Sequence, residues 1–353
     1  MQTNERYPSG DGSRIVERKV HFNAVDGFPL SFTRLSDADK DPGQPVLLVH
    51  GAGVRSSIFS PPHPQSLDLV LARAGYDVWN LDWRASINHA PNSWTLDAAA
   101  VLDYPAAIKT VVGSTGNSQL KAIIHCQGST SFMLALVAGL LPEVTTVISN
   151  AVSLHTVVPP GSVLKARFAE PLVARLVPFL NPQWGIHCPP GWPRFIDFLV
   201  RATHHECNNA VCKYSSFTYG TAFPVLWRHE NLSDRTHEWL KGEFAHVPMT
   251  FFSQMRECIR AGYLVSTGKY PQLPATVVAA PPKTDARVVF LAGEHNDCFL
   301  AESQARSYDF MERHAPGRHA FYELAGYGHL DVFIGKNAAR DVFPLILDEL
   351  GRA

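Results

Sequence analysis

The chain has 353 residues, a length that fits one large α/β domain or one domain with a substantial insertion. Its composition, 46% hydrophobic and 18% charged, is that of a globular protein with an ample core. A formal net charge of -1 excludes a chain-wide basic surface for nucleic acid or for an anionic membrane.

The first residues, 1–16, are polar and rich in Gly, Ser and charge, and we expect them to be disordered. They lack the apolar core of a secretory signal, and no run of 18 apolar residues occurs in the chain. We therefore expect no integral membrane span and a cytoplasmic location. In that reducing compartment the six cysteines are expected to be free thiols.

Apolar and alternating runs predict a series of strands. We expect them at 19–24, 30–35, 45–49, 76–81, in the run from 120 to the thiol at 126, and at 145–149, 287–292 and 319–323. The first two flank Asp26-Gly27, a hairpin signal. Amphipathic runs with helix-start and helix-stop residues predict helices at 67–74, 95–112 (with Thr95 as the N-cap), 301–314 and 337–350.

Strands that alternate with helices at this spacing predict a mostly parallel, doubly wound sheet with right-handed connections. The alternation stops after about residue 155 and resumes near 286, and the interval is rich in Pro, His and aromatic residues. We therefore expect an α/β core made of 17–154 and 286–353. The interval 155–285 is expected to form an inserted, mostly helical cap.

Cys126 stands where the apolar run from residue 120 gives way to a helical pattern. A strand–turn–helix of this kind holds a side chain on a tight, strained turn at the carboxyl edge of the sheet. The helix N-terminus behind the thiol favours the thiolate. We predict Cys126 as a nucleophile, with a buried structural cysteine as the alternative.

Residues after two later strands complete the pattern of an acyl-transfer site. His329 lies between glycines after the last strand and is expected to act as the base. Asp297 follows the preceding strand and is expected to orient that base, with Glu294 as its rival. Asp82 and Asp103 are interpreted as capping or packing residues.

The glycine-rich stretch 50–53 follows the first buried strand. Glycine there permits close backbone approach, so we expect the backbone N–H groups of Ala52 and Gln127 to form an oxyanion hole. Three further residues are expected to contact the substrate: Gly51, Gly53 and Trp83.

The order and spacing of these residues resemble those of α/β hydrolases, with cysteine in place of the serine usually found at the elbow. More closely, the chain is similar to the hydrolase-like domain fused to glucose–methanol–choline oxidoreductases of the cholesterol oxidase type. The similar stretches cover most of the chain from about residue 17: 75–79, 81–86, 102–107, 125–129, Cys207, Cys212 and 219–232.

A more distant resemblance is to polyhydroxyalkanoate synthases, which also have cysteine at the elbow. It rests on 77–83, 95–97 and 126–128. Ile124 stands where the elbow usually has its first glycine, and Ser129 where many members have a second.

The site and the resemblance imply acyl transfer through a covalent acyl-Cys126 intermediate. A thiolate attacks thioesters and activated esters readily, and it is the better leaving group when an amide is attacked. A thioesterase, esterase, acyltransferase or cyclase therefore fits better than a protease. The aromatic residues of 155–285 suit a hydrophobic ester or thioester, free or carrier-bound. Whether water, an alcohol, an amine or a carbon nucleophile accepts the acyl group stays open, as does a homodimer.

Two other functions stay open. One is an acyltransferase like the polyhydroxyalkanoate synthases, and the other is a non-catalytic binding or scaffold subunit of an oxidoreductase system. We expect no cofactor. His204, His205, Cys207 and Cys212 carry donor atoms for zinc but match no regular zinc framework. We therefore expect no metal there, and helix-end packing or a local disulfide instead.

Overall fold

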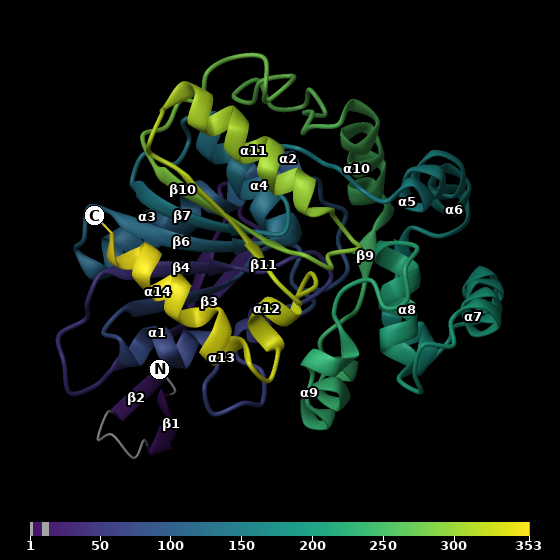
Figure 1. Cartoon of the computed structure of the whole chain (residues 1–353), viewed down its shortest axis with the longest axis horizontal. Helices are drawn as coiled ribbons and strands as arrows, with labels where there is room; N and C mark the ends of the chain where they lie inside the picture. Colours follow the sequence, from purple (N-terminus) through teal and green to yellow (C-terminus); the bar gives the residue numbers. More distant parts are fainter. Residues whose placement is uncertain (1–2, 9–13, 353) are drawn as a thin grey trace.

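The computed structural model describes residues 3–8 and 14–352, and its centre is a twisted sheet (Figure 1). Within these residues the sheet has nine strands. In spatial order they are β1 (Thr3–Pro8), β2 (Arg14–Asn23), β3 (Pro29–Asp37), β5 (Asp77–Asp82), β4 (Pro45–Val49), β6 (Leu120–His125), β7 (Val144–Asn150), β10 (Arg287–Gly293) and β11 (Ala320–Leu324).

The strands from β5 to β11 are parallel, whereas β1, β2 and β3 add to one edge in antiparallel pairs. Strands β4, β5 and β6 are buried at every position, as the apolar runs predict for strands covered on both faces. The predicted hairpin is confirmed, since β2 and β3 pair on either side of Asp26-Gly27. The doubly wound α/β prediction is therefore confirmed.

The prediction of disorder over residues 1–16 is wrong for residues 3–8 and for residues 14–16, which begin β2. Thr3–Pro8 forms β1, which pairs antiparallel with the first half of β2. The pairing supplies backbone hydrogen-bond partners that the polar composition alone does not reveal. Residues 1–2 and 9–13 lie outside the described residues.

Helices cover both faces of the sheet (Figure 1). They are α1 (Leu67–Arg73), α14 (Phe343–Gly351) and, on the other face, α3 (Tyr104–Thr115), α4 (Cys126–Val137) and α11 (Ala301–His314). Thr95 caps α2 (Leu96–Ala98) by accepting a hydrogen bond from the Ala98 N–H. A π-helical turn, η2 (Ala99–Asp103), joins α2 to α3. Short helices precede α14: α12 (Asp331–Ile334) and α13 (Ala338–Asp341).

Between β7 and β10 the chain is mostly helical, and Figure 1 shows this part gathered at one side of the sheet. Its helices are α5 (Pro160–Leu164), η3 (Lys165–Ala169), α6 (Glu170–Leu176), η4 (Pro182–Gly185), α7 (Trp192–Thr203), α8 (Ala210–Tyr219), η5 (His229–Asn231), α9 (Asp234–Trp239), η6 (Leu240–Gly242) and α10 (Met249–Ala261). It also contains the strand pair β8 (Phe179–Leu180) and β9 (Val247–Pro248). We refer to residues 155–285 as the cap segment.

Two clusters of buried apolar side chains hold the molecule together. The larger one spans the sheet, the helices on its faces and part of the cap segment. The smaller one lies within the cap segment: Val177, Leu180, Trp184, Ile196, Val200, Tyr214 and Met249. None of the helices in residues 3–8 and 14–352 is long and apolar enough to cross a bilayer.

Candidate active site

Cys126 is the first residue of α4, directly after β6, and its backbone has φ +55°. A non-glycine residue in this left-handed region costs about 1–2 kcal/mol. The strain is retained because β6 and α4 are both buried throughout. Ile124 is accommodated inside β6 with no exposed surface. Cys126 thus occupies a strained strand-to-helix elbow at the carboxyl edge of the sheet.

His329 lies in the loop after β11, and its partner is Asn296, from the loop after β10. His329 Nδ1 and Asn296 Oδ1 are 3.1 Å apart. The prediction that Asp297 orients His329 is wrong. Asp297 is the residue after Asn296, and its side chain is half-buried. In the part of the chain that the structure describes, Asp297 makes no hydrogen bond or ion pair with His329, whose Nδ1 contacts Asn296 instead.

The hydrogen bonds of Asn296 determine which nitrogen of His329 carries the proton. Asn296 Oδ1 also accepts from the backbone N–H groups of Cys298 and Phe299, each at 3.1 Å. This atom is therefore the amide oxygen, so His329 Nδ1 donates to it. His329 Nε2 is left as an acceptor, and it is buried without a partner among the described residues. A ring nitrogen of His329 lies within 4.8 Å of the Cys126 sulfur.

A second histidine, His125, supports this arrangement from the end of β6. Asn150, the last residue of β7, donates from Nδ2 to His125 Nδ1 at 2.9 Å and to the His329 carbonyl at 3.2 Å. The rings of His125 and His329 are 4.8 Å apart between centroids. Asn150 therefore ties the elbow to the His329 loop.

The loop after β4 lies against the thiol. A methyl group built on Gly51 would be 3.3 Å from the Cys126 sulfur. The backbone N–H groups of Gln127 and Ala52 face that sulfur and oppose, in part, the rise in its pKa that burial causes. Tyr219, from the cap segment, donates its hydroxyl to the Ala52 carbonyl at 2.8 Å. An oxyanion hole requires two convergent N–H groups, and Ala52 and Gln127 remain the predicted donors.

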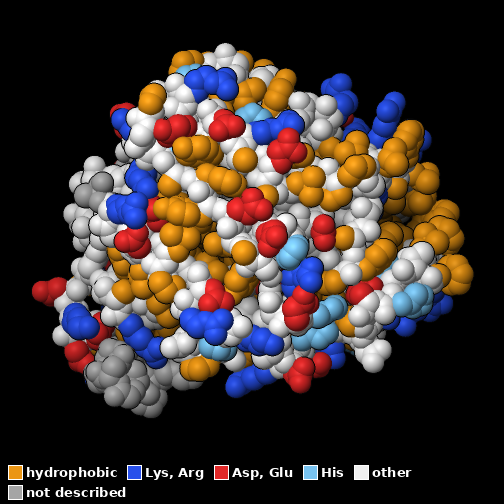
Figure 2. Space-filling view, viewed as in Figure 1, with side chains coloured by type: hydrophobic (Ala, Val, Ile, Leu, Met, Phe, Trp, Pro, Cys, Tyr) orange, Lys and Arg blue, Asp and Glu red, His pale blue; other side chains and the backbone are white. Residues whose placement is uncertain are grey.

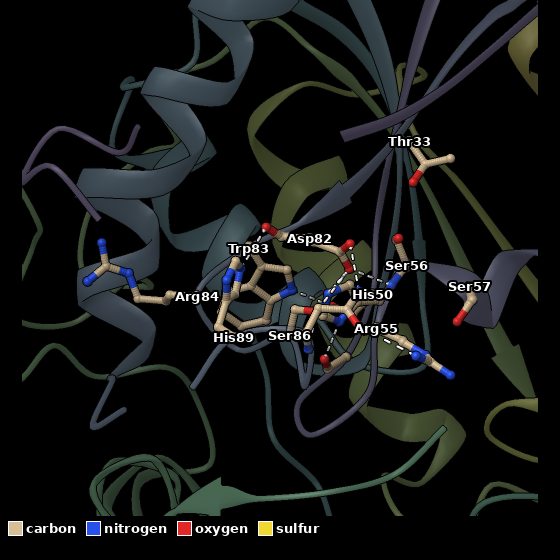
Figure 3. A network of polar contacts seen from close by, with 12 residues as sticks. Thr33, His50, Arg55, Ser56, Ser57, Asp82, Trp83, Arg84, Ser86 and His89 are labelled. Carbon is tan, nitrogen blue, oxygen red and sulfur yellow. Dashed lines mark hydrogen bonds and ion pairs between the residues drawn. The ribbon is translucent and has the colours of Figure 1, made fainter. Parts of the chain in front are cut away.

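A buried polar network supports this loop from behind (Figure 3). Asp82, at the end of β5, accepts from the Ser56 N–H and the Ser86 hydroxyl, each at 2.9 Å. His50 Nε2 lies 3.8 Å from the same carboxylate. Burial by itself would raise the pKa of Asp82, but His50, the Lys19 ammonium at 3.1 Å and the Ser56 N–H lower it to about 2. The carboxylate that we interpret from the sequence as a packing residue therefore anchors the loop at residues 50–56.

Trp83 belongs to this supporting network. Its side chain is fully buried, and its indole N–H donates to the His50 carbonyl at 2.9 Å. In this structure Trp83 supports the loop after β4, and its contact with substrate remains a prediction. Gly53 accepts a backbone hydrogen bond from Ala245, in the cap segment, at 3.0 Å.

The other predicted acids have structural partners. Asp103 is buried and pairs with Arg84 at 2.6 Å. Glu294 is exposed and accepts from the Gly326 N–H at 2.8 Å, so it links the two loops. Asp331, which sequence reasoning missed, accepts from the Gly328 N–H at 2.8 Å and thereby holds the His329 loop. Its position two residues after His329 is the signal that could have identified it.

The pKa values of Cys126 and His329 differ from the sequence-based expectation that the thiolate is favoured. Burial raises the pKa of the Cys126 thiol to about 12, and the N–H groups of Gln127 and Ala52 oppose this only in part. Burial also lowers the pKa of His329 to about 3. Cys126 and His329 therefore face each other as a neutral thiol and a neutral imidazole at pH 7.

The donor atoms of His125, Cys126 and His329 lie within 4.8 Å of one another, a set that could also ligate a metal ion. However, His125 Nδ1 and His329 Nδ1 are already hydrogen-bonded. The strained turn and the N–H groups beside the sulfur have no role in metal binding. The arrangement fits a nucleophile, a base and an oxyanion hole.

The sheet order, the elbow between β6 and α4, and the histidine after the last strand together define the α/β-hydrolase fold, and this chain has that fold. Solved structures agree over nearly the whole chain. An esterase from Thermogutta terrifontis aligns with a TM-score of 0.57 at 15% identity, covering 94% of this chain and 98% of the esterase. Epoxide hydrolase VrEH1 from Vigna radiata aligns with a TM-score of 0.57 at 14% identity, covering 96% and 99%.

Sequence relatives include lipases and esterases. The chain is 34% identical over 153 residues to gastric triacylglycerol lipase of Homo sapiens, covering 38% of this chain and 36% of the lipase. It is 27% identical over 172 residues to sterol esterase 2 of Saccharomyces cerevisiae, covering 42% and 32%. The matches thus span about a third of these two relatives. A probable lipase of Schizosaccharomyces pombe is 21% identical over 373 residues, covering 96% and 77%.

No protein-family model matches the chain. The finer resemblances, to the oxidoreductase-fused domain and to the polyhydroxyalkanoate synthases, remain predictions.

Proposed function

We propose that this protein is an acyl-transfer enzyme that acts on hydrophobic esters through a Cys126–His329–Asn296 triad. The observation that supports this most directly is the His329 ring. Its Nδ1 is held by Asn296, and Nε2, which has no partner in residues 3–8 and 14–352, is the atom available for the thiol of the strained elbow. Cysteine, histidine and asparagine form the triad of papain-like proteases, so the combination is chemically competent.

The reaction begins with a neutral pair. As Cys126 Sγ attacks the acyl carbonyl carbon, the thiol proton moves to His329 Nε2, and the carbonyl oxygen becomes an oxyanion. The N–H groups of Ala52 and Gln127 stabilise that oxyanion. When the tetrahedral intermediate collapses, the bond to the leaving oxygen breaks and that oxygen takes the proton from Nε2. An acyl thioester on Cys126 remains.

The second step restores the enzyme. An acceptor X–H, where X–H is water or an alcohol, gives its proton to His329 Nε2 as X attacks the thioester carbon. The C–S bond then breaks, and Sγ recovers the proton. Asn296 keeps Nδ1 protonated throughout. Because Asn296 has no charge, it orients the imidazole without stabilising the imidazolium as strongly as a carboxylate would.

Large exposed apolar side chains on the cap segment support the inference that the substrate is hydrophobic. Trp192, Phe195 and Phe198, on α7, are 52%, 52% and 65% exposed, and Phe168 is 65% exposed. Figure 2 shows hydrophobic side chains gathered at the edge of the molecule where these helices lie. The names of the sequence relatives, a triacylglycerol lipase and a sterol esterase, point to the same class of ester.

The test is direct capture of the acyl-enzyme. We expect a chromogenic medium-chain ester, or the matching acyl thioester, to add one acyl group to the intact protein, and peptide mapping to place it on Cys126. Cys126→Ala should abolish the adduct, whereas Cys188→Ala, which removes a half-exposed thiol of the cap segment, should not. Analysis of the products with and without added alcohol then separates hydrolysis from transfer.

A non-catalytic scaffold predicts the opposite result. If no acyl probe modifies the protein and Cys126→Ala leaves every turnover rate unchanged, the catalytic proposal fails.

A further inference from the structure

Four metal-donor side chains converge in the cap segment, away from the Cys126 triad in sequence. The Cys207 sulfur lies 3.8 Å from His237 Nε2, and the Cys212 sulfur lies 3.4 Å from His229 Nε2. One donor atom from each of the four residues lies within 4.8 Å of the other three. We name these four residues the Cys₂His₂ cluster.

The spacing of these atoms matches a tetrahedral metal site. Zinc binds sulfur at about 2.3 Å and nitrogen at about 2.0–2.1 Å, which at tetrahedral angles separates a sulfur ligand from a nitrogen ligand by about 3.5 Å. The two measured sulfur–nitrogen distances, 3.4 and 3.8 Å, lie on either side of this value. A disulfide is not formed, because Cys207 and Cys212 are both free thiols.

Both imidazoles turn the same atom, Nε2, toward the sulfurs. The side chain of Asn209 also holds the backbone near the Cys₂His₂ cluster through hydrogen bonds. Asn209 accepts from the Cys212 N–H at 3.1 Å and donates to the His237 carbonyl at 2.7 Å. One side chain thus holds the segments of two of the four residues, Cys212 and His237, in place. Such outer contacts are typical of the residues around a structural metal site.

We propose that Cys207, Cys212, His229 and His237 bind one zinc ion that fastens the cap segment. Two thiolates, two neutral imidazoles and Zn²⁺ sum to no net charge, which suits a half-buried position. Binding releases the two thiol protons to solvent. Four protein ligands leave no open position for substrate or water, so the site is structural rather than catalytic.

The position of the Cys₂His₂ cluster gives it a mechanical role. Cys207 follows α7, whose buried residues Ile196 and Val200 belong to the small cap cluster. His229 lies between Trp227 and Leu232, which belong to the main core. Figure 1 shows α7, α8 and α9 together on the side of the molecule away from the C-terminus. The ion would therefore join a thinly packed part of the cap segment to the main core.

The sequence does not reveal this site, because its spacing is irregular. Four residues separate Cys207 from Cys212, and seven separate His229 from His237. The histidines that we consider from the sequence lie elsewhere. His204 Nδ1 contacts the Thr203 hydroxyl at 2.8 Å, and His205 Nε2 contacts the Ala202 carbonyl at 3.2 Å.

The first test uses the full-length wild-type protein, purified without chelator. Elemental analysis should find about one zinc per chain. Cobalt added to the metal-free protein should give the intense visible bands of tetrahedral Co²⁺ together with thiolate charge transfer. A chain that arrives without zinc, and that fails to compete with a chromophoric chelator for added Zn²⁺, overturns the proposal. So does a Cys207–Cys212 disulfide in the alkylated, unreduced protein.

Variants locate the ion. Cys207→Ser and His237→Ala should each lower zinc content by at least about tenfold. Cys188→Ser, which changes a cap thiol outside the Cys₂His₂ cluster, should retain it. Cys126→Ser should also retain it, which excludes the other candidate donor set around His125 and His329. Loss of zinc in Cys126→Ser would place the ion at the triad and contradict the proposal.

Discussion

At the scale of single residues, the state of the Cys126 thiol sets the chemistry. From the sequence we expect the helix N-terminus to favour a thiolate, but burial outweighs it and raises the pKa to about 12. Since His329 has its pKa lowered to about 3 by burial, the pair holds no ion pair at pH 7. In the resting protein Cys126 is therefore a neutral thiol.

This predicts how Cys126 alkylation depends on pH. With a raised pKa, the thiolate fraction grows tenfold per pH unit over the whole range from 6 to 9. The rate of iodoacetamide labelling at Cys126, followed by peptide mass spectrometry, should therefore rise steadily across it. A rate that is already level between pH 6 and 8 would show a preformed thiolate–imidazolium pair, and the neutral description would be wrong.

The choice between Asn296 and Asp297 gives a second prediction at this scale. Asn296→Ala removes the acceptor that holds His329 Nδ1, so we expect kcat to fall on the order of 10²-fold with little change in KM. Asp297→Asn, the matched neighbour, should change kcat by less than about threefold. Asn296→Asp should rescue much of the activity, since it restores an acceptor. A large loss in Asp297→Asn with an active Asn296→Ala would return the role to Asp297.

At the scale of elements, the contact between α4 and the end of β4 positions the elbow. Gly128, in the first turn of α4, faces the backbone so closely that an added Cβ would lie 2.2 Å from the His50 carbonyl oxygen and 2.8 Å from Val49 Cγ1. Backbone cannot yield as a flexible side chain can.

Gly128→Ala should therefore lower the free energy of unfolding by about 3 kcal/mol and reduce esterase activity, because the oxyanion loop must move. Gly113→Ala is the matched control in α3, where nothing lies within 4 Å of the added Cβ. We expect it to be neutral or stabilising by up to about 1 kcal/mol. Urea unfolding followed by tryptophan fluorescence measures both, and equal effects of the two substitutions would contradict the packing argument.

Much of the fold could be predicted from the sequence, because hydrophobic periodicity reports burial directly. The run 45–49 is a strand with the predicted bounds, and helix 301–314 is α11. Helix 301–314 shows the helical spacing of buried residues, whereas the wholly apolar run 45–49 is assigned to a strand by its short length and β-branched content. The π-helical turn at Ala99–Asp103 was not predictable, since apolar periodicity does not distinguish it from an α-helix.

The site could be predicted less completely, because sequence order places a loop but not the direction of its side chains. The positions of Cys126 and His329, close together past two strand ends, could be predicted because strand ends and glycines mark them. Asn296 and Asp297 are adjacent, and general chemistry favours the carboxylate. Only the backbone N–H groups of Cys298 and Phe299, which turn Asn296 toward His329, decide between them. The Cys₂His₂ cluster depends in the same way on tertiary contacts.

At the scale of the whole molecule, buried histidines make stability depend on pH. Burial lowers the pKa of seven of them below the unfolded value of about 6.5: to about 4 for His50, His155, His204 and His319, to about 3 for His329, well below 6.5 for His125, and in the same direction for His246. Below pH 6.5 the unfolded chain therefore binds protons that the folded chain does not, so stability falls as pH falls.

We expect the free energy of unfolding to be lower by at least about 2 kcal/mol at pH 5 than at pH 7.5. Burial raises the pKa of Asp331 to about 6, so protonation of Asp331 stabilises the folded protein as pH falls from about 6 to 4. This single carboxyl group opposes the effect of several histidines and is outweighed by it. Urea unfolding at both pH values checks the sign. Equal or greater stability at pH 5 would mean that these histidines are protonated in the folded protein.

The exposed aromatic side chains of α7 lie at the edge of the molecule where Figure 2 shows hydrophobic side chains gathered. Such a body adsorbs at a boundary between oil and water. Once it is adsorbed, the quantity that limits the rate is the area of the oil droplets rather than the amount of dissolved ester. Finer emulsification of the same mass of ester should therefore raise the rate. Combining Trp192→Ser, Phe195→Ser and Phe198→Ser should remove that dependence on droplet size while leaving turnover of a dissolved short-chain ester unchanged.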